Sequence, residues 1–277
     1  MIKSYSKINL FLKVLKRNKK KLHNIQSYIM LLDLYDEINI KNGKKDKIKF
    51  IGQFKQNISK STNSISQSLS LLRKHNLIKK EKRYEITIRK KIPVFGGLGG
   101  GTSNAAFLVK YFLKKKISIK LLAIFEKKIG SDFRIFFLNQ SYQKSLKNIK
   151  KLKKNYLLYF ILLYPNIKCS TKKIYSKVKK FSLPLKRDPS NIQSKDRFIY
   201  FIKNECNDLQ KIVVQKHIKI SFFLDLIKEQ KNCLFSRMTG SGSVCFGVFP
   251  DKKSASQGLR AIKKKLPNYW SVLTKSI

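Results

Sequence analysis

The sequence predicts a protein of mixed helices and strands that forms two domains or one large domain. The chain has 277 residues, 42% of them hydrophobic, so it is long enough to bury a sizeable core. Residues 84–89 alternate apolar and polar side chains, as a half-buried strand does. From Ser103 onward, apolar residues recur at helical spacing up to residue 113. Strand and helix signals therefore occur close together in one chain.

The first predicted strand covers residues 6–14. Lys7 and Asn9 fall on one side of this strand and apolar residues on the other. Residues 39–60 are rich in lysine and predict a hairpin-like segment. Residues 63–73 then have the spacing of an amphipathic helix, and Asn63 suits the N-cap position at its start.

Lys90 follows the strand at residues 84–89, and a glycine-rich loop comes directly after it. Five of the chain's 12 glycines lie within positions 96–101, between the strand and the helix that is predicted from Ser103. Such a loop exposes backbone N–H groups beside the positive end of a helix, which suits a phosphate group. The flanking apolar elements argue against a flexible linker. The loop is not a P-loop of the Walker type, because Gly101 is followed by Thr102 and not by a lysine. It is not a dinucleotide-binding loop either, because it has no G-x-G-x-x-G pattern.

Three further elements are predicted in the rest of the chain. Residues 121–128 form a short helix that ends at Gly130, and Asp132 follows in a turn, where an aspartate often serves only to form the turn. Residues 156–164 have the length and composition of a buried strand. Residues 237–247 contain a second glycine turn that leads into a strand.

The net charge is +47, from 62 Lys and Arg residues against 15 Asp and Glu residues. The basic clusters are spread along the chain, and no nucleic-acid-binding module is recognisable, so we expect solvated surfaces that attract polyphosphate ligands. The four cysteines have no metal-site spacing and are expected to be reduced and mostly buried. No segment approaches the roughly 20 apolar residues of a membrane helix. These features predict a cytoplasmic protein without a membrane segment.

Three motifs together resemble the GHMP kinases, the family of galactose, homoserine, mevalonate and phosphomevalonate kinases. The first is Lys-Ile-Asn-Leu-Phe-Leu at residues 7–12, and the second is Pro-x-x-x-Gly-Leu-Gly-Gly-Gly-Thr-Ser-Asn-Ala at residues 93–105. The third is Met-Thr-Gly-Ser-Gly-Ser at residues 238–243. They occur in the family's order over nearly the whole chain. Residues 7–12 and His23 resemble the corresponding residues of one group within the family. Its members phosphorylate the 2-hydroxyl of a cytidine diphosphate ester in the non-mevalonate isoprenoid pathway.

The resemblance implies an α+β protein with the two-domain GHMP kinase fold. A ribosomal-protein-S5-like N-terminal domain would cover residues 1–150, and a smaller α/β C-terminal domain would cover residues 151–267. A terminal strand at about residues 268–277 would rejoin the first domain. The active site would lie in the cleft between the domains.

The resemblance also implies residue roles. Lys7 would be the catalytic cation and Asp132 the catalytic carboxylate, with ATP as phosphoryl donor and Mg²⁺ as cofactor, held by Thr102 or Ser103. The implied ATP-binding residues are Pro93, Gly96, Gly97, Leu98, Gly99, Gly100, Gly101, Thr102, Ser103, Asn104, Asn63 and Lys90, although Lys90 could equally face water. The implied substrate-binding residues are Asn9, His23, Thr171, Tyr175, Thr239, Gly240 and Ser241.

The chain departs from the family pattern at several positions. Lys21 and Leu22 replace the family's Gly-Tyr, so we expect the cytosine base to be held with one aromatic residue fewer. Arg134 replaces a proline close to Asp132. Three alternatives stay open: a family kinase that acts on a mevalonate-type alcohol, a basic RNA-binding protein on the same scaffold, and a catalytically silent copy. The implied partners are ATP and the cytidine ester, and no specific nucleic acid or membrane is expected as a partner. The expected oligomeric state is a monomer or a weak homodimer.

Overall fold

The computed structural model describes residues 1–17, 23–56, 58–59, 62–114 and 117–277, so Lys21 and Leu22 lie outside the described residues. The chain divides into two compact units. Unit 1 comprises Met1–Lys7, Leu34–Val94 and Gly99–Leu138, and unit 2 comprises Ile8–Asp33, Phe95–Leu98 and Asn139–Ile277. These units interleave along the chain, whereas the domains predicted from the sequence are divided at residue 150, with only the terminal strand at about residues 268–277 returning to the first domain.

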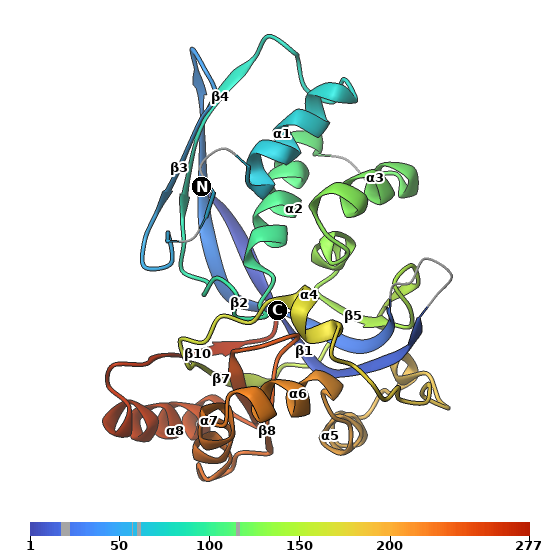
Figure 1. Ribbon diagram of the computed structural model, residues 1–277, viewed down its shortest axis with the longest axis vertical. Helices are drawn as coiled ribbons and strands as arrows, with labels where there is room; N and C mark the ends of the chain where they lie inside the picture. Colours follow the sequence, from blue (N-terminus) through green and yellow to red (C-terminus); the bar gives the residue numbers. More distant parts are fainter. Residues whose placement is uncertain (18–22, 57, 60–61, 115–116) are drawn as a thin grey trace. The chain divides into compact units, whose positions relative to one another are not determined.

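Groups of strands are separated by one or more helices along the chain (Figure 1). The elements up to residue 151 are β1 (Ile2–Arg17), β2 (His23–Gly43), β3 (Lys47–Ile51), α1 (Ser64–Lys74), β4 (Arg83–Arg89), α2 (Gly100–Leu113), α3 (Ile119–Ile129), the 3₁₀ helix η1 (Phe133–Phe137), β5 (Gln140–Gln143) and β6 (Ile149–Lys151).

The later elements confirm the predicted buried strand within residues 156–164. They are β7 (Tyr159–Tyr164), α4 (Thr171–Tyr175), the 3₁₀ helix η2 (Pro189–Asn191), α5 (Lys195–Asn204), α6 (Asp208–Lys216), α7 (Lys219–Lys228), β8 (Phe235–Met238), β9 (Cys245–Phe249), α8 (Lys252–Lys265) and β10 (Trp270–Lys275).

The sheet of unit 1 places β4 between β2 and β3. β2 runs antiparallel to β4, with Glu37 opposite Arg89 and Gly43 opposite Arg83. β3 instead pairs with β4 in parallel, so the hairpin-like segment predicted for residues 39–60 is wrong. A parallel neighbour needs a crossover connection, and α1 lies in the connection between β3 and β4.

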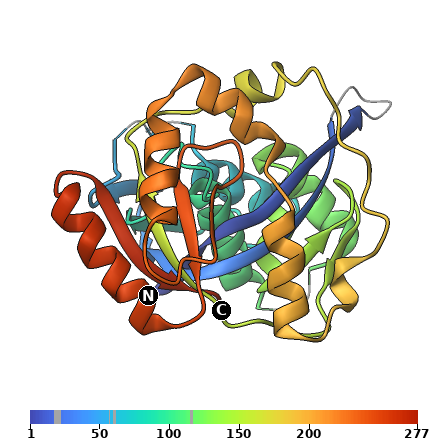
Figure 2. The same ribbon diagram turned by 90° about the horizontal axis from the view of Figure 1, so that it is seen from below.

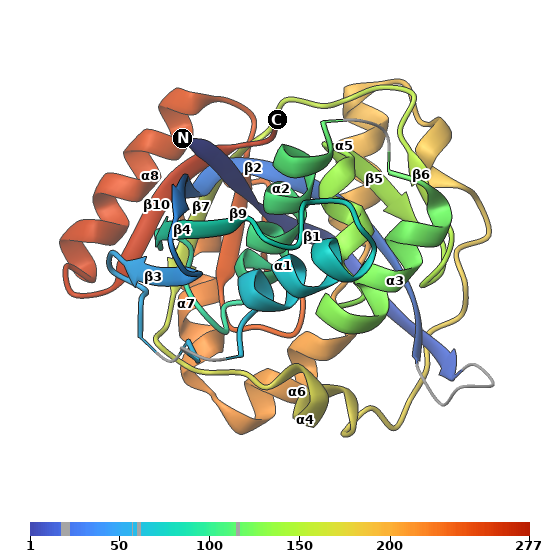
Figure 3. The ribbon, with the colours of Figure 1, turned by 90° about the horizontal axis from the view of Figure 1, so that it is seen from above.

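Helices α1 and α2 cover one face of the unit 1 strands (Figures 1 and 3). Their buried residues include Ile65 and Leu69 of α1 and Leu108 of α2, which pack with Ile38 and Ile86 of the sheet. The apolar side chains of α1 recur at positions three and four apart, which is why this helix buries one stripe. The packing fixes the direction of α2 and therefore the place of the glycine loop before it.

Helix α2 begins at Gly100, three residues before the predicted start at Ser103. Gly99 occupies the N-cap position with φ of 71°, in the left-handed region that glycine adopts without strain. The last glycines of the loop therefore form the first helical turn instead of preceding it.

Unit 2 contains a four-stranded sheet in the order β10-β7-β9-β8, antiparallel throughout. Helices α6, α7 and α8 pack on this sheet (Figure 2), and the shared core includes Val213, Phe223 and Ile262. Leu12 and Val14 of β1 belong to the same core. The C-terminal strand β10 pairs with β7, and Ser276 beyond it forms a bridge with Leu32.

Mixed helices and two sheets confirm the predicted α+β fold class. Within the described ranges, no helix is both long enough and apolar enough to cross a membrane. All four cysteines are free thiols: Cys169 and Cys245 are buried, Cys233 is half-buried and Cys206 is exposed.

Candidate active site

The N-terminus of α2 in unit 1 presents an anion-binding geometry. No side chain caps the helix at Gly99, so the first-turn N–H groups are not occupied by a capping side chain. Ser103 N donates to Gly99 O at 2.8 Å, which closes the first turn. The helix dipole places partial positive charge at this end. The loop therefore has the backbone groups that the predicted phosphate site requires.

Lys7 lies directly beside this turn. A Cβ atom placed on Gly99 would lie 3.1 Å from Lys7 Cγ, 3.3 Å from Lys7 Cε and 2.8 Å from Phe136 Cζ. Glycine at this position thus lets the lysine side chain pass close to the loop backbone. The side chain of Lys7 is only 6% exposed, so its position is fixed by packing.

Lys7 Nζ lies 3.6 Å from Asp132 Oδ2. Burial lowers the pKa of the Lys7 ammonium group, and the adjacent Asp132 carboxylate opposes this shift. The Asp132 side chain is 33% exposed, so an incoming hydroxyl group can approach it. Unit 1 therefore brings together the lysine, the carboxylate and the glycine turn that the sequence predicted as one site.

Asp132 precedes the 3₁₀ helix η1 but makes no side-chain capping bond to it. The turn is closed by backbone bonds, with Phe133 N donating to Gly130 O at 3.0 Å. The carboxylate is thus directed to Lys7 and does not act only as a turn former. Arg134 donates from Nη2 to Glu126 Oε2 at 2.9 Å, so Arg134 forms an ion pair with Glu126.

A buried polar network supports the first turn of α2. Lys90 is 2% exposed, and its ammonium group forms an ion pair with Asp36 and donates to Asn104 Oδ1 at 3.0 Å. Asn104 Nδ2 donates to Asp36 Oδ2 at 3.0 Å and to Ser4 Oγ at 2.9 Å. The interpretation of Lys90 as a water-facing residue is therefore wrong, since its charge is matched inside unit 1.

Other residues of the predicted ATP site also face inward. Pro93 and Leu98 are buried, and Ser103 donates from Oγ to Tyr5 O at 2.5 Å. Thr102 is half-buried, and a Cβ on Gly130 would lie 3.3 Å from its Oγ1. These inward side chains hold the loop, which leaves its backbone and Thr102 as the groups suited to a nucleotide.

Asn63 is the N-cap of α1, as one interpretation of the sequence predicted. Its Oδ1 accepts from Ile65 N at 3.1 Å and Ser66 N at 3.0 Å, and Ser66 Oγ accepts from Asn63 N at 3.1 Å. This reciprocal arrangement is a capping box. The predicted contact of Asn63 with ATP stays a prediction.

In unit 2, residues Phe95–Leu98 pack against the loop between β8 and β9. Gly96 O accepts from Val244 N at 3.1 Å. Gly97 has φ of 77°, and a Cβ there would clash with Thr239 O and lie 3.2 Å from Gly242 O. The two glycine motifs therefore meet by close backbone approach, which side chains at Gly97 would prevent.

Five predicted substrate residues gather around that loop. Asn9 N donates to Thr239 Oγ1 at 3.0 Å, and the hydroxyl groups of Thr171 and Ser241 lie 2.8 Å apart. Gly240 O accepts from Asn207 Nδ2 at 2.8 Å, and Asn207 Nδ2 also donates to Met238 O at 2.7 Å. Asn207 was not among the predicted site residues, yet it fixes the loop on which three of them lie.

His23 and Tyr175, the predicted base-binding residues, contact each other with ring centroids 5.6 Å apart. Thr171 and Tyr175 begin and end the one-turn helix α4, so they lie on the same side of it. His23 also contacts Phe181, with centroids 5.7 Å apart. The sequence offered no signal for Phe181, because it lies in a loop without periodicity and outside the three motifs.

Known proteins resemble this chain over its whole length. Residues 199–268 match the family model described as GHMP kinases C terminal. A 4-diphosphocytidyl-2-C-methyl-D-erythritol kinase of Pelagibacter ubique is 40% identical over 284 residues, which cover 100% of this chain and 98% of the relative. A Wolbachia pipientis protein of the same name is 30% identical, with 100% and 98% coverage.

Solved structures show the same fold. A crystal structure of 4-(cytidine 5'-diphospho)-2C-methyl-D-erythritol kinase superposes with a TM-score of 0.76 at 19% identity, covering 99% of this chain and 98% of that one. A mevalonate kinase superposes with a TM-score of 0.67 at 16% identity, covering 99% and 98%. The chain therefore belongs to the GHMP kinase family, on the branch of the 4-diphosphocytidyl-2-C-methyl-D-erythritol kinases.

Proposed function

We propose that this protein transfers the γ-phosphoryl group of ATP to the 2-hydroxyl of 4-diphosphocytidyl-2-C-methyl-D-erythritol. The observation that carries this proposal is the Lys7–Asp132 pair beside the uncapped first turn of α2. The 40% identity to a kinase of that name over the whole chain supports the choice of substrate. ATP use follows from membership of a kinase family.

The first turn of α2 binds the phosphate groups of ATP in this proposal. Its backbone N–H groups and the positive end of the helix dipole offset the phosphate charge. The buried network of Lys90, Asp36 and Asn104 holds the turn in place beforehand. Since phosphoryl transfer depends mainly on positioning and electrostatic stabilisation, a preformed cradle contributes directly to the rate.

Asp132 accepts the proton of the attacking hydroxyl group, whose oxygen then forms a bond to the γ-phosphorus while the bond to the bridging oxygen of ADP breaks. Lys7, whose Nζ lies 3.6 Å from Asp132 Oδ2, stabilises the negative charge that develops on the transferred group. Its burial strengthens this electrostatic effect, because water screens it poorly there.

Only some of the oxygen atoms near the loop are available as ligands for Mg²⁺. Thr102 Oγ1 and the partly exposed Asp132 carboxylate are oxygen ligands of the kind that Mg²⁺ prefers, whereas Ser103 Oγ is already bonded to Tyr5 O. Among the described residues, no three His, Cys, Asp or Glu side chains form a metal cluster. We therefore propose Thr102, not Ser103, as the protein ligand, with the phosphates as the main ligands. The ion would neutralise charge on the phosphate oxygens.

Unit 2 supplies recognition of the cytidine ester in this proposal. His23 and Tyr175 provide a ring surface and a hydrogen-bonding imidazole for the base. The hydroxyl groups of Thr171, Thr239 and Ser241 provide polar contacts on the neighbouring loop. The proposed partners are therefore two small molecules, ATP and the ester.

The test is a coupled assay of ADP release by the purified protein with ATP, Mg²⁺ and the cytidine ester. Asp132→Asn removes the proton acceptor and should lower kcat by about 100-fold or more. Asp46→Asn is the matched control, since Asp46 is also an acid of unit 1 but pairs with Arg73 at the surface. The control should keep kcat close to that of the unsubstituted protein.

Two results would contradict the proposal. The first is full activity of Asp132→Asn. The second is turnover of mevalonate that CDP does not inhibit, together with no turnover of the cytidine ester. This second result would assign the chain to a kinase of a smaller alcohol.

A further inference from the structure

We propose that Phe181 is an aromatic wall of the nucleobase site in unit 2, at a place in the chain to which no motif points. The inference rests on the proposed function, because it names a residue that contacts the cytosine ring of the proposed substrate. The sequence predicts one aromatic residue fewer around the base, because Leu22 replaces the family's tyrosine, and Phe181 would supply an aromatic ring in its place.

Three rings from separate segments form one cluster. His23 lies at the start of β2, Tyr175 at the end of α4, and Phe181 in the loop that follows α4. The His23 ring centroid is 5.6 Å from that of Tyr175 and 5.7 Å from that of Phe181, with interplanar angles of 33° and 40°. Both distances are typical of aromatic pairs. Phe181 thus has the same relation to His23 as the predicted base-binding tyrosine.

Phe181 keeps part of its ring accessible. It is 39% exposed, whereas Tyr175 packs partly against the buried core of unit 2. A planar base can therefore cover the free part of the Phe181 ring without unpacking the core. Stacking of this kind strengthens the binding of a base because the two flat faces are in contact and exclude water.

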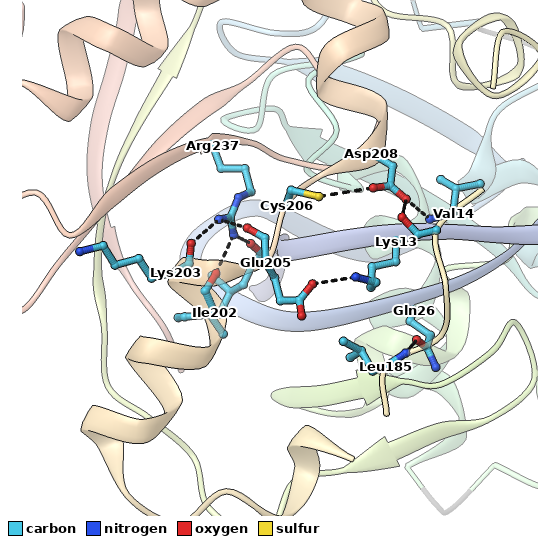
Figure 4. A network of polar contacts seen from close by, with 12 residues as sticks. Lys13, Val14, Gln26, Leu185, Ile202, Lys203, Glu205, Cys206, Asp208 and Arg237 are labelled. Carbon is cyan, nitrogen blue, oxygen red and sulfur yellow. Dashed lines mark hydrogen bonds and ion pairs between the residues drawn. The ribbon is translucent and has the colours of Figure 1, made fainter. Parts of the chain in front are cut away.

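The loop that carries Phe181 is anchored to β1 by the next residue. Ser182 N donates to Val14 O at 2.9 Å, and Ser182 Oγ donates to Asp208 Oδ2 at 2.7 Å. Asp208 Oδ2 also accepts from Val14 N at 2.6 Å. Figure 4 shows Asp208 directed at Val14 in this way. The anchor ties the segment that carries Phe181 to β1, the strand that pairs with the strand of His23.

A second anchor lies four residues after Phe181. Leu185 N donates to Gln26 Oε1 at 2.8 Å (Figure 4). Gln26 is 3% exposed and belongs to β2, the strand that begins at His23. The segment is thus tied to β1 and β2, which limits the entropy lost when a ligand binds.

The charge of the segment suits the rest of the ligand. Lys172, Lys173, Lys177, Lys179 and Lys180 are exposed and lie within ten residues of Phe181. A nucleoside diphosphate carries its negative charge on the 5′ side of the ribose, one sugar away from the base, so basic residues around the base site favour its approach. A ring cluster beside lysines is therefore better suited to a nucleotide than to an apolar ligand.

The test measures CDP binding by titration calorimetry. Phe181→Ala should weaken CDP binding by about 5- to 100-fold, as expected for the loss of one stacked ring. Phe181→Leu keeps the apolar bulk without the π face and should be weakened similarly. Phe181→Tyr should bind CDP as the unsubstituted protein does. The control is Phe222→Ala, which removes a 53% exposed phenylalanine of α7 and should leave binding unchanged.

Two further readouts separate stacking from packing. In the kinase assay, Phe181→Ala should raise the KM for the cytidine ester and leave kcat and the KM for ATP unchanged. The loss of affinity should be equal for CDP and UDP, because every base has a face that can stack. Equal melting temperatures of the variants would confirm that the fold is intact, as the exposure of the ring predicts.

The outcomes distinguish this inference from the proposed function. CDP binding that is unchanged in Phe181→Ala or in Phe181→Leu would overturn the inference, while turnover of the cytidine ester by the unsubstituted protein would still support the function. No turnover of the ester by the unsubstituted protein would refute the function, and a loss of CDP affinity confined to the Phe181 variants would still support the ring contact.

Discussion

Three lysine side chains of unit 1 have different surroundings, and these surroundings decide what each can do. Lys7 is buried beside Asp132, with a lowered pKa. Lys90 is buried in an ion pair with Asp36. Among the described residues no carboxylate forms an ion pair with Lys110, which donates to Phe136 O and lies 4.4 Å from the Phe107 ring centroid. Burial lowers the pKa of Lys110 to about 8.

The lowered pKa of Lys110 predicts a pH dependence of stability. An unfolded lysine has a pKa of about 10.4. Between pH 8 and that value, the unfolded state holds a proton that the folded state has released, so the free energy of unfolding rises with pH. Below pH 8 both states are charged, and this contribution is constant. Lys110→Met removes this rise.

The measurement is urea unfolding at a series of pH values through this window. The difference in unfolding free energy between the unsubstituted protein and Lys110→Met should shift in favour of the unsubstituted protein as the pH rises. Lys120→Met, at an exposed site, is the control and should show no such trend. Parallel pH profiles for Lys110→Met and the unsubstituted protein would contradict the assigned pKa.

Adjacent lysines test whether Lys90 is structural. Lys90→Met leaves the buried Asp36 carboxylate without its ion-pair partner and should cost about 3–5 kcal/mol of unfolding free energy. Lys91 is 45% exposed at its side chain and pairs with Glu37, so Lys91→Met should cost about 1 kcal/mol or less. Denaturant titration of both variants checks this. Equal stability of the two variants would show that Lys90 does not support the loop.

At the residue scale, the sequence predicted side chains that lie in motifs and missed those defined by packing. Lys7 and Asp132 were found because each lies in a recognisable local pattern, and the structure places them 3.6 Å apart. The partner of Lys90 lies 54 positions earlier in the chain, so no local pattern could reveal it. Phe181 meets His23 only through the path of a loop.

At the scale of elements, the space around each glycine decides whether the turn between the loop and helix α2 tolerates a side chain at that position. Gly99 has φ of 71°, and a Cβ there would meet Phe136 and Lys7. Gly101 is exposed, and the nearest atom to its Cβ would be Ser64 Oγ at 4.0 Å. The two glycines are two positions apart, yet only the first is required by the fold.

Alanine substitutions at these two glycines should therefore behave differently. Gly99→Ala should lower the melting temperature and reduce kcat by about tenfold or more, because it displaces the Lys7 side chain. Gly101→Ala should keep the melting temperature or raise it slightly. It should raise the KM for ATP if the nucleotide approaches the backbone there. Thermal denaturation and steady-state kinetics check both variants, and full activity of Gly99→Ala would refute the role of close packing.

The elements themselves were largely predictable, and their pairing was not. The helix predicted at residues 63–73 is α1, and the strand predicted at residues 84–89 is β4. Periodicity reports which face of an element is buried, but not which strand lies beside it. β3 pairs with β4 in parallel because the chain crosses over through α1 between them. The composition of the lysine-rich segment did not predict this crossover.

At the scale of the whole molecule, the net charge of +47 is the dominant feature. Such an excess of one sign repels itself in the compact state, and salt screens this repulsion. The melting temperature should therefore rise when KCl is increased from about 50 to about 500 mM, since the screening length shortens over this range. Thermal denaturation across a salt series measures it.

The same salt series tests whether the charge has a dedicated partner. Binding to an RNA of arbitrary sequence should weaken steeply as salt increases, as expected for contacts to phosphates alone. Turnover of the cytidine ester should not require RNA. RNA binding that persists at high salt and depends on sequence would revive the hypothesis of a nucleic-acid-binding protein.

The core of unit 2 has a consequence for how the chain is made. Leu12 and Val14 pack in that core with Ile262, and Arg237 donates to Leu10 O. A ribosome releases the first of these residues long before the last. The nascent chain must therefore hold Leu12 and Val14 without these core partners until residue 262 has been synthesised, which leaves apolar surface exposed to aggregation and to chaperones in the meantime.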